Sequence, residues 1–399
     1  MEADRPDPID LGIGQPEDAV LPRALLRRAA EHRLSLPDNS YLQYGPEEGS
    51  ASLRAALSEF LTRHYGTAVH ARELLLTSGA SHALDLILAS RTSPGDLVMV
   101  ETPTYFFGLD ILRSRRLRIV PVPMDAEGLD VAALERMLHE EVPKLLYTIP
   151  VFHNPTGVTL SPRRRVRLVE LAEEYGFPIV ADEVYQLVAE PDRVPPPLRV
   201  QGGARILSLG SFSKILGPGL RIGWIECDAH QVGRLREDAV LRSGGGVSPM
   251  TGALVESALT LGLQDEFLVR IRQLYERRRR HMIGLLSRLL PEGVTMRMPE
   301  GGYYVWLQLP EDVDAAALVG RALAAGVGFR PGGIFTPDGS LANCLRICFT
   351  YYEEALLTTA VERLVPVLRD AVASSTRSGV GGTRHGQVAA RAGEQVGQC

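Results

Sequence analysis

Short apolar runs alternate with helical segments through the middle of this 399-residue chain. The runs predict strands at 74–79, 96–103, 118–124, 144–150, 178–185, 204–213 and 220–228. Apolar residues at helical spacing between them predict helices at 50–65, 81–90, 105–112, 129–139 and 161–175. Strands that alternate with helices form a mostly parallel sheet with helices on both faces. The pattern therefore predicts an α/β fold.

The pattern changes after residue 258. An arginine-rich helix is followed by two strands that we expect to pair antiparallel, then a helix, a strand and a last helix, at 263–290, 294–299, 303–310, 314–325, 344–352 and 353–372. We expect a large domain over 44–258 and a smaller α+β domain over 259–372, to which the N-terminal arm and helix of 1–43 also belong. The segment 373–399 is rich in Gly, Ser, Gln and Arg and has no apolar period, so we expect a disordered tail.

Composition excludes several classes of protein. A hydrophobic content of 45% and a charged content of 23% are typical of a soluble globular chain. The net charge of −5 gives no reason to expect nucleic acid or a membrane as a partner, and no apolar run approaches the roughly 20 residues of a membrane span. The acidic, proline-bearing N-terminus does not read as a secretory signal. The four cysteines show neither disulfide nor metal-ligand spacing, so we expect a cytoplasmic protein without a metal.

The stretch Ser208–Trp224 places one lysine in a turn of small residues, SLGSFSKILGPGLRIGW. A lysine in such a turn is accessible to a ligand and can be desolvated, which makes its amine nucleophilic. The serine hydroxyls and Arg221 supply donors and a planar cation for a phosphate. An isolated lysine such as Lys214 is more often a solvated surface residue, so support has to come from the rest of the chain.

Polar residues also follow several other predicted strands, in the segments Ser78–Ser81, Thr102–Tyr105, Val151–Gly157 and Asp182–Tyr185. Ligands of open α/β sheets bind outside the carboxyl ends of the strands. Taken singly, each segment has a structural explanation: a helix cap, a core aromatic, an Asn-Pro turn or a capped carboxylate. Their coincidence at one sheet edge favours a ligand site.

These motifs together resemble the class I/II, fold type I, pyridoxal-phosphate-dependent aminotransferases. The matching motifs are ASHAL after TSG, HNPTG, ADEVY, SFSK and PGLRIGW. The resemblance extends from LGIGQPE near the N-terminus to LRICFT and the last helix. It implies a homodimeric cytoplasmic enzyme that exchanges an amino group between an L-amino acid and a 2-oxo acid, with pyridoxal 5′-phosphate as the cofactor.

The resemblance also implies roles around the cofactor ring. Lys214 would bind the cofactor as a Schiff base and shuttle a proton, and Asp182 would keep the pyridine nitrogen protonated. Tyr185 and Asn154 would hydrogen-bond the phenolate oxygen, and Tyr105 would stack on the ring.

Two further groups of residues follow from the same resemblance. The phosphate would be held by Gly79, Ala80, Ser81, Ser211, Arg221 and, from the neighbouring subunit, Tyr44. The substrate would be held by Arg346, which matches the arginine that pairs with the α-carboxylate, by Asn154, and by Gly14 in the N-terminal arm. Ser81-His82 departs from the usual pattern, and the run Gly244–Gly246 lies where relatives contact the partner subunit.

Alternatives remain open at this point. The same carbanion supports β- or γ-elimination, replacement or cyclisation, including of an S-adenosylmethionine-type substrate. A transcriptional regulator would carry a DNA-binding domain, for which too few residues precede LGIGQP. Arg277–Arg280 reads as a nucleic-acid patch or, more simply, as a solvated helix face. The sequence does not indicate which substrate side chain the enzyme selects. Arg23 and Arg330 are candidates for binding a second carboxylate. Tyr303 and Tyr304 fit the core as well as they fit a substrate pocket.

Overall fold

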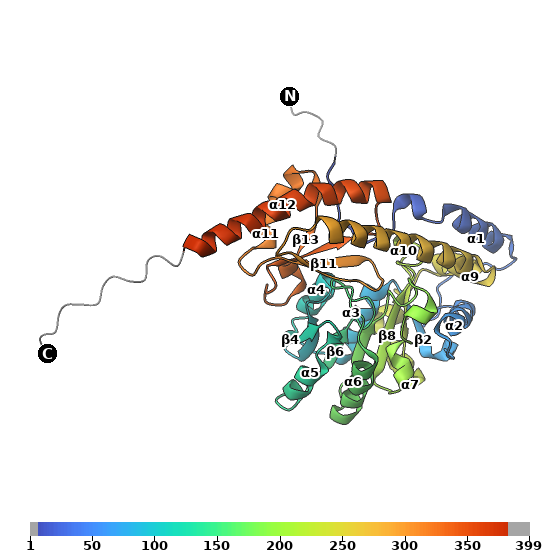
Figure 1. Ribbon diagram of the computed structural model, residues 1–399. Helices are drawn as coiled ribbons and strands as arrows, with labels where there is room; N and C mark the ends of the chain where they lie inside the picture. Colours follow the sequence, from blue (N-terminus) through green and yellow to red (C-terminus); the bar gives the residue numbers. More distant parts are fainter. Residues whose placement is uncertain (1–6, 382–399) are drawn as a thin grey trace, which may run out of the picture.

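The computed structural model describes residues 7–381, and its largest element is an eight-stranded sheet with the strand order β2-β9-β8-β7-β6-β3-β4-β5 (Figure 1). In chain order, the strands are β2 (Leu74–Thr77), β3 (Leu97–Thr102), β4 (Arg118–Asp125), β5 (Gly128–Leu129), β6 (Leu145–Thr148), β7 (Ile179–Asp182), β8 (Ile206–Ser211) and β9 (Gly223–Glu226). Strands β4, β3, β6, β7 and β8 pair in parallel. Strand β9 is antiparallel to β2 and β8, and β5 is antiparallel to β4. The mostly parallel sheet is confirmed.

Alternate residues of the central strands face two separate cores. Leu146 and Ile179 belong to a cluster with side chains of α5 and α6, whereas Leu145 and Val180 belong to a cluster with α2, α3 and α4. Helices therefore cover both faces, which explains why β2, β6, β7, β8 and β9 are wholly buried. The helices of this part are α2 (Ala51–Tyr65), α3 (Ala80–Arg91), α4 (Phe106–Ser114), α5 (Val131–Leu138), α6 (Pro162–Tyr175), α7 (Ala229–Leu235), α8 (Ala239–Arg242) and α9 (Pro249–Thr260).

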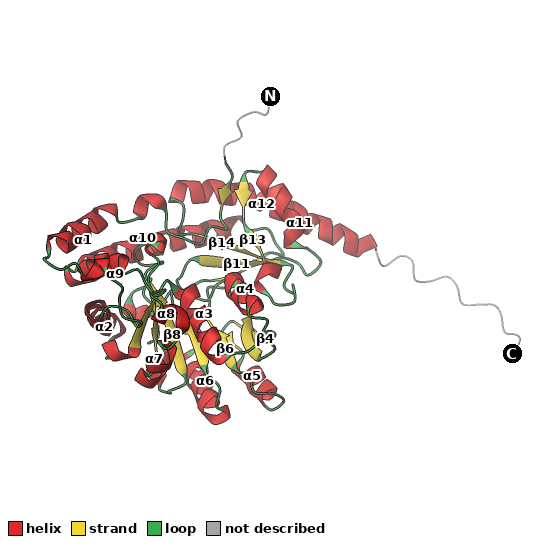
Figure 2. Cartoon of the chain, turned by 180° about the vertical axis from the view of Figure 1, so that it is seen from behind, coloured by secondary structure: helices red, strands yellow, loops and turns green. Residues whose placement is uncertain are grey.

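The expected α+β unit lies above the carboxyl edge of this sheet, as the ribbon shows from both sides (Figures 1 and 2). It contains a four-stranded antiparallel sheet in the order β10-β11-β14-β13 and a two-stranded parallel pair, β1-β12. Its elements are β1 (Ile9–Asp10), α10 (Leu263–Leu289), β10 (Thr295–Arg297), β11 (Tyr304–Gln308), α11 (Ala315–Ala324), β12 (Val327–Gly328), β13 (Arg330–Pro331), β14 (Cys344–Cys348) and α12 (Glu354–Gly381). The expected antiparallel pair corresponds to β10 and β11.

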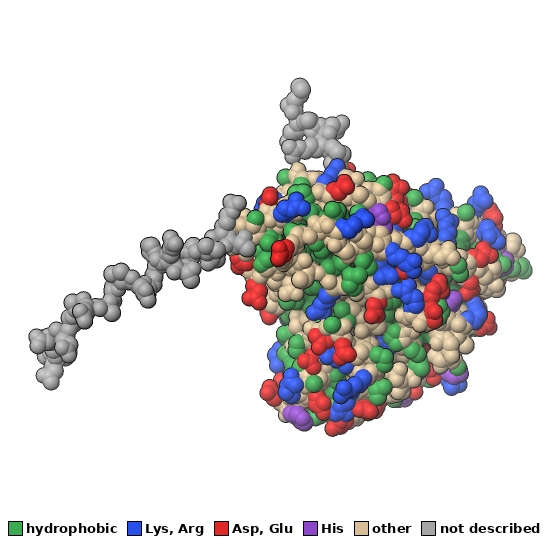
Figure 3. All heavy atoms as spheres, in the orientation of Figure 1, with side chains coloured by type: hydrophobic (Ala, Val, Ile, Leu, Met, Phe, Trp, Pro, Cys, Tyr) green, Lys and Arg blue, Asp and Glu red, His purple; other side chains and the backbone are tan. Residues whose placement is uncertain are grey.

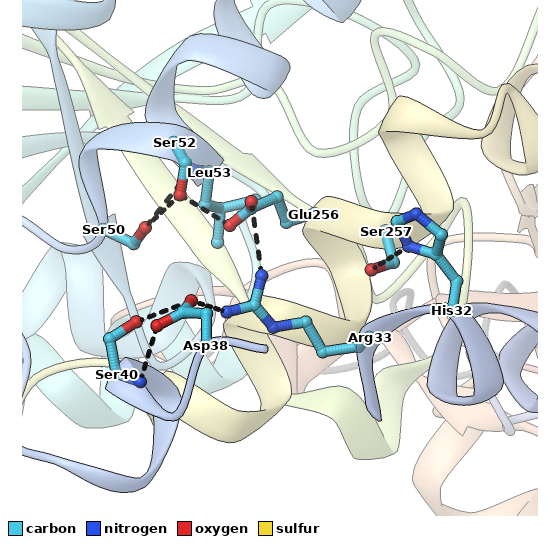
Figure 4. A network of polar contacts seen from close by, with 9 residues as sticks. All are labelled: His32, Arg33, Asp38, Ser40, Ser50, Ser52, Leu53, Glu256 and Ser257. Atoms are coloured by element: carbon cyan, nitrogen blue, oxygen red, sulfur yellow. Dashed lines mark hydrogen bonds and ion pairs between the residues drawn. The ribbon is translucent and has the colours of Figure 1, made fainter. Parts of the chain in front are cut away.

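The N-terminal helix α1 (Arg23–Ser35) packs against α9, and polar contacts at its end connect it to α9 and α2 (Figure 4). The Arg33 guanidinium pairs with Asp38 and lies 3.8 Å from Glu256 of α9. Glu256 in turn accepts a 2.8 Å hydrogen bond from Ser52 of α2. Asp38 also accepts from the backbone N–H of Ser40 at 2.9 Å. The loop between α1 and α2 is thus held at both of its ends.

The last helix corrects the expectation of a disordered tail from residue 373. Helix α12 continues to Gly381, because each added turn gains backbone hydrogen bonds once the helix has been nucleated. Ser374 also donates to the carbonyl of Asp370 at 2.8 Å, and Ser375 donates to Asp312 at 2.5 Å. The rest of the expected tail, 382–399, lies outside the described residues.

Three arginines of the run 277–280 are paired with acidic side chains. Arg278 is buried, donates to the Thr350 carbonyl at 2.6 Å and pairs with Glu17. Arg279 and Arg280 both pair with Glu276, at 2.8 and 2.6 Å. Basic and acidic side chains are interspersed over the face drawn in Figure 3. Within 7–381, no helix combines the length and apolar character that crossing a membrane requires.

Candidate active site

A cavity of about 540 Å³ opens where the carboxyl ends of the parallel strands meet the small antiparallel sheet. It gathers nearly all of the candidate residues: Gly14, Ala80, Ser81, Tyr105, Asn154, Asp182, Tyr185, Ser211, Lys214, Arg221 and Arg346. Parallel strands place their carboxyl ends at one edge, which explains why residues far apart in the sequence converge here. Gly79 lies at the entrance of α3, beside this cavity, whereas Tyr44 is not part of its lining.

Lys214 lies in the loop that connects β8 to β9. Its ammonium donates a 2.7 Å hydrogen bond to the carbonyl of Gly14 and lies 5.0 Å from the centre of the Tyr303 ring. The Tyr303 hydroxyl donates to the backbone carbonyl of Lys214 at 3.0 Å. Desolvation by these surroundings lowers the pKa of Lys214 to about 8, so its amine is neutral much more often than that of a surface lysine.

Asp182 ends β7 and is part of the cavity lining. Its Oδ2 accepts a 2.8 Å hydrogen bond from the Tyr147 hydroxyl, while Oδ1 is buried and has no hydrogen-bond partner among the described residues. Burial raises the pKa of Asp182, against the opposing effects of the Tyr147 hydrogen bond, the backbone N–H of Val184 and the charge of Lys214. A buried polar atom without a partner is costly, so a ligand donor that reached Oδ1 would relieve that cost.

Arg346 is the most buried cation of the cavity, at 2% exposure. It donates 2.8 Å hydrogen bonds to Oδ1 of Asn154 and to the carbonyl of Gly12. Its neighbours Leu345 and Ile347 pack in the core of the small unit, as the strand alternation predicts. These acceptors are all neutral, so the charge of the guanidinium is not compensated by them. It can therefore bind a carboxylate through the N–H donors that lie in its plane.

The other end of the cavity suits an anion. Gly79 has φ +88° and precedes α3, so the first backbone N–H groups of that helix face the cavity. A Cβ at Gly79 would lie 2.4 Å from Nη2 of Arg221, and this nitrogen donates to the Ser78 carbonyl at 3.0 Å. The Ser211 and Ser213 hydroxyls lie 3.0 Å apart nearby in the lining. The positive φ favours glycine at this position, and a side chain there would also displace the Arg221 guanidinium.

Several lining residues were missed or left undecided by sequence reasoning. Tyr147 reads as a core strand residue, yet its hydroxyl contacts Asp182. The hydroxyl of Tyr304 accepts a 3.3 Å hydrogen bond from the hydroxyl of Tyr185. Arg330 pairs with Asp10 at 3.0 Å. Strand pairing would have indicated Arg330. It is the cross-strand partner of Arg346, so both side chains lie on the same face of the small sheet.

Comparison with known proteins identifies the family. Residues 6–364 match the sequence profile described as aminotransferase class I and II. The chain belongs to this family. It is 34% identical to aromatic-amino-acid aminotransferase 1 of Thermococcus litoralis, over 91% of this chain and 88% of that protein. The crystal structure of a multiple substrate aminotransferase from Thermococcus profundus superposes with a TM-score of 0.86 and 32% identity, covering 93% of both chains.

A third relative is named as an uncharacterized HTH-type transcriptional regulator, YdcR of Escherichia coli, at 35% identity over 75% of this chain and 64% of that protein. The two relatives named as aminotransferases are covered almost end to end. The present chain is therefore an aminotransferase, an enzyme that moves an amino group between an amino acid and a 2-oxo acid. This family implies pyridoxal phosphate, and the unpaired Oδ1 of Asp182 together with the anion site at the start of α3 fits that group.

The low pKa of Lys214 predicts how the aminotransferase captures its cofactor. Only the neutral amine attacks an aldehyde, and the amine of the cofactor-free protein is mostly protonated below pH 8 and neutral above it. We expect the rate of pyridoxal phosphate attachment to rise with pH and level off above about 8, rather than near the value of about 10.4 for an exposed lysine. Stopped-flow absorbance measures the rate. Borohydride reduction and peptide mapping should label Lys214, and a label on Lys144 instead would contradict the assignment.

Replacing Arg346 with lysine is expected to weaken substrate binding although the charge is kept. Lysine cannot reproduce a planar pair of donors, so we expect a loss of about 2 to 4 kcal/mol in kcat/KM, roughly 30- to 1,000-fold. Arg330→Lys is the matched control, because the partly exposed pair with Asp10 is worth less than about 1 kcal/mol. Both variants should retain the visible absorbance of bound cofactor. Equal losses in the two variants would place the carboxylate elsewhere.

Proposed function

We propose that the cavity binds pyridoxal 5′-phosphate at Lys214 and that the enzyme transfers the amino group of an L-amino acid to a 2-oxo acid. The observation that carries this proposal is the combination, in one cavity, of a lysine with a pKa of about 8 and a buried carboxylate with an unpaired oxygen. Asp182 would hold a proton on the pyridine nitrogen. Tyr185 and Asn154 would hold the phenolate oxygen, and Tyr105 would stack on the ring.

The remaining cofactor contacts would come from the anion site. The first N–H groups of α3 at Gly79, Ala80 and Ser81 would bind the phosphate together with Ser211 and Arg221. This places the phosphate at one end of the cavity and Arg346 at the other. Arg346 and Asn154 would bind the substrate carboxylate, and the arm at Gly14 would cover it.

Each protein group then has a defined part in catalysis. The bound cofactor supplies an electron sink for the charge that develops on the substrate α-carbon. Lys214 would move the proton between the α-carbon and the cofactor, since a pKa of about 8 lets its amine both take up and release a proton near physiological pH. Asp182 would keep its charge beside the ring nitrogen, and Arg346 would orient the α-carbon by fixing the carboxylate. The arm residue Gly14 would help to exclude water.

The walls of the cavity favour an amino donor with an apolar or aromatic side chain. Phe106, Phe107 and Ile111 of α4 line the cavity. The charge of Arg330, the additional arginine in the lining, is already paired with Asp10. Apolar side chains gain free energy by leaving water for such a wall, whereas a second carboxylate would have to displace Asp10 from Arg330.

A screen of amino donors tests both the reaction and its specificity. Each donor converts the bound cofactor in a single turnover, which is followed by visible absorbance. We expect L-phenylalanine and L-leucine to react with higher kcat/KM than L-glutamate. Fastest reaction with L-glutamate would contradict the apolar wall. Release of acetate, ammonia and pyruvate from O-acetyl-L-serine without an acceptor would instead indicate elimination.

We also propose a homodimer in which Tyr44 reaches the phosphate site of the partner. Tyr44 is 88% exposed, and Leu42 beside it is 69% exposed. A Cβ at Gly244 would lie 2.7 Å from the Tyr44 ring, so this ring lies against the backbone of the glycine run. The loop that carries Tyr44 is anchored by Arg33 and Asp38 at one end and by Ser52 at the other (Figure 4). The anchored loop supports presentation of an aromatic side chain to a second subunit.

The dimer proposal predicts complementation between two inactive variants. Lys214→Ala lacks the amine, and Tyr44→Ala lacks the hydroxyl that we assign to the partner's site. Mixed dimers contain one site of two with an intact Lys214 and an intact Tyr44, and about half of the dimers are mixed after complete exchange of an equimolar mixture. Subunit exchange should therefore restore activity to about a quarter of that of wild type. Mixtures that stay inactive after exchange, verified by mass spectrometry of the dimers, would show that Tyr44 does not act across the interface.

The three cysteines that the structure describes, Cys227, Cys344 and Cys348, carry free thiols. Free buried thiols are usual in reducing compartments, which supports the inference of a cytoplasmic enzyme.

A further inference from the structure

Tyr304 opens β11 and has no part in the function assigned so far. It is 2% exposed and lines the same cavity as Lys214 and Arg346. Along β11 its neighbour Val305 faces the core of the small unit, so strand alternation turns the Tyr304 ring toward the cavity. A buried hydroxyl without a hydrogen-bond partner costs free energy, so the hydroxyl of a buried tyrosine is expected to have a partner.

The hydroxyl of Tyr304 lies between the arm and Tyr185. The Tyr185 hydroxyl donates to it at 3.3 Å, and a Cβ at Gly14 would lie 2.2 Å from it. Each phenol has one proton to donate. If Tyr185 gives its proton to a ligand in the cavity, its oxygen can accept the proton of Tyr304 instead. The pair then forms a short chain of donors that ends at the ligand.

The ring of Tyr304 supports Arg346. The central carbon of the guanidinium lies 4.0 Å from the centre of this ring, closer than it is to Phe335 at 5.0 Å or Phe106 at 5.8 Å. A guanidinium over an aromatic face is attracted to it, and the contact also fixes its plane. Arg346 is further held by Asn154 at 2.8 Å. Tyr304 therefore contacts both the carboxylate-binding arginine and one of the two groups assigned to the phenolate oxygen.

We propose that Tyr304 is a positioning residue that connects these two parts of the site: its ring orients Arg346 for the substrate carboxylate, and its hydroxyl strengthens Tyr185 as a donor to the phenolate oxygen of the cofactor. This inference rests on the proposed function. It adds a second connection to the direct hydrogen bond between Arg346 and Asn154. Tyr304 would thus be connected to the phenolate oxygen along two routes, one through Tyr185 and one through Arg346 and Asn154.

The hydroxyl part has a spectroscopic consequence. A donor to the phenolate oxygen competes with the protonated nitrogen of the lysine linkage for that oxygen, so a stronger donor favours loss of the nitrogen's proton. Tyr185 becomes a stronger donor when it accepts a hydrogen bond itself, because chains of hydrogen bonds polarise one another. Removal of the Tyr304 hydroxyl should therefore raise the pKa of the bound chromophore.

Other titratable groups influence the hydroxyl pair of Tyr185 and Tyr304, so they must be the same in every variant that is compared. Burial raises the pKa values of Tyr185 and Tyr304, so neither phenol ionises near neutral pH. The charged and titratable groups facing this hydroxyl pair from the surrounding elements are Tyr105, Asp182, Lys214, Tyr303, Arg346 and Cys348. The variants below leave all of them in place.

The first experiment compares the holoenzyme of wild type with Tyr304→Phe and Tyr275→Phe. Tyr275 is the matched control, since its buried hydroxyl contacts another tyrosine hydroxyl, that of Tyr303, at 3.2 Å, outside the cavity lining. Visible spectra between pH 5 and 10 give the chromophore pKa. We expect Tyr304→Phe to raise it by roughly 0.3 to 1 pH unit and Tyr275→Phe to leave it unchanged. An unchanged value in Tyr304→Phe, or an equal shift in the control, would overturn the hydroxyl part.

The second experiment separates the ring from the hydroxyl. The probe is 3-phenylpropionate, a carboxylate that has no amino group to react, and its binding is read from the chromophore spectrum. Tyr304→Phe keeps the aromatic face and should bind the probe as wild type does, whereas Tyr304→Leu should bind it about 5- to 30-fold more weakly. Equal affinity in Tyr304→Leu and Tyr304→Phe would overturn the ring part.

Failure of the underlying function gives a different result. A wild-type protein that forms no chromophore on Lys214 would overturn the proposed function and this inference together. A normal chromophore and normal donor turnover, with a pKa and a probe affinity that do not respond to Tyr304, would overturn this inference alone. Tyr304→Phe changes one buried atom, so it decides the hydroxyl part even if Tyr304→Leu does not fold.

Discussion

The site depends on backbone packing at Gly223, where β9 passes directly beneath the turn between β2 and α3. A Cβ at Gly223 would lie 2.8 Å from the carbonyl oxygen of Gly210 and 2.8 Å from the carbonyl carbon of Gly79, so three segments of backbone meet without space for a side chain. This contact sets the distance between the start of α3 and the loop between β8 and β9. The anion site and Lys214 belong to those two segments, so their separation is fixed by main chain rather than by flexible side chains.

Electrostatics adds a second constraint at the opposite end of the cavity. Lys214 and Arg346 donate to the carbonyls of Gly14 and Gly12, two residues of the same arm. A backbone carbonyl stabilises a cation by its dipole, but it has no net charge and does not neutralise the charge of the cation. The described contacts therefore leave an excess of positive charge toward the arm, while the carboxylate of Asp182 lies at the end of β7. This uneven distribution suits substrates that bring a carboxylate of their own.

The alternation of strands and helices in the sequence predicted the large sheet, because such a pattern has few solutions. Strand alternation also accounts for the direction of Arg346, whose neighbours Leu345 and Ile347 face the core. The two-residue strands β1, β12 and β13 were not predicted, since two residues have no period. Motif residues such as Asn154 follow strand ends and were found in the cavity. Tyr147 lies within a strand and reads as core; the partner of its hydroxyl, Asp182, is 35 residues away and is set by the register of β6 and β7.

The basic side chains of this protein are almost entirely arginine: of 43 lysines and arginines, only Lys144 and Lys214 are lysines. Guanidinium groups stay protonated and do not react with acylating reagents or aldehydes, and Lys144 is exposed at the start of β6. Amine-directed chemistry therefore has one surface lysine, one lysine in the cavity and the chain's own α-amino group to act on. A ligand bound at Lys214 would block labelling of that lysine. The number of tags in a mass spectrum of the intact protein would therefore report whether the cavity is occupied.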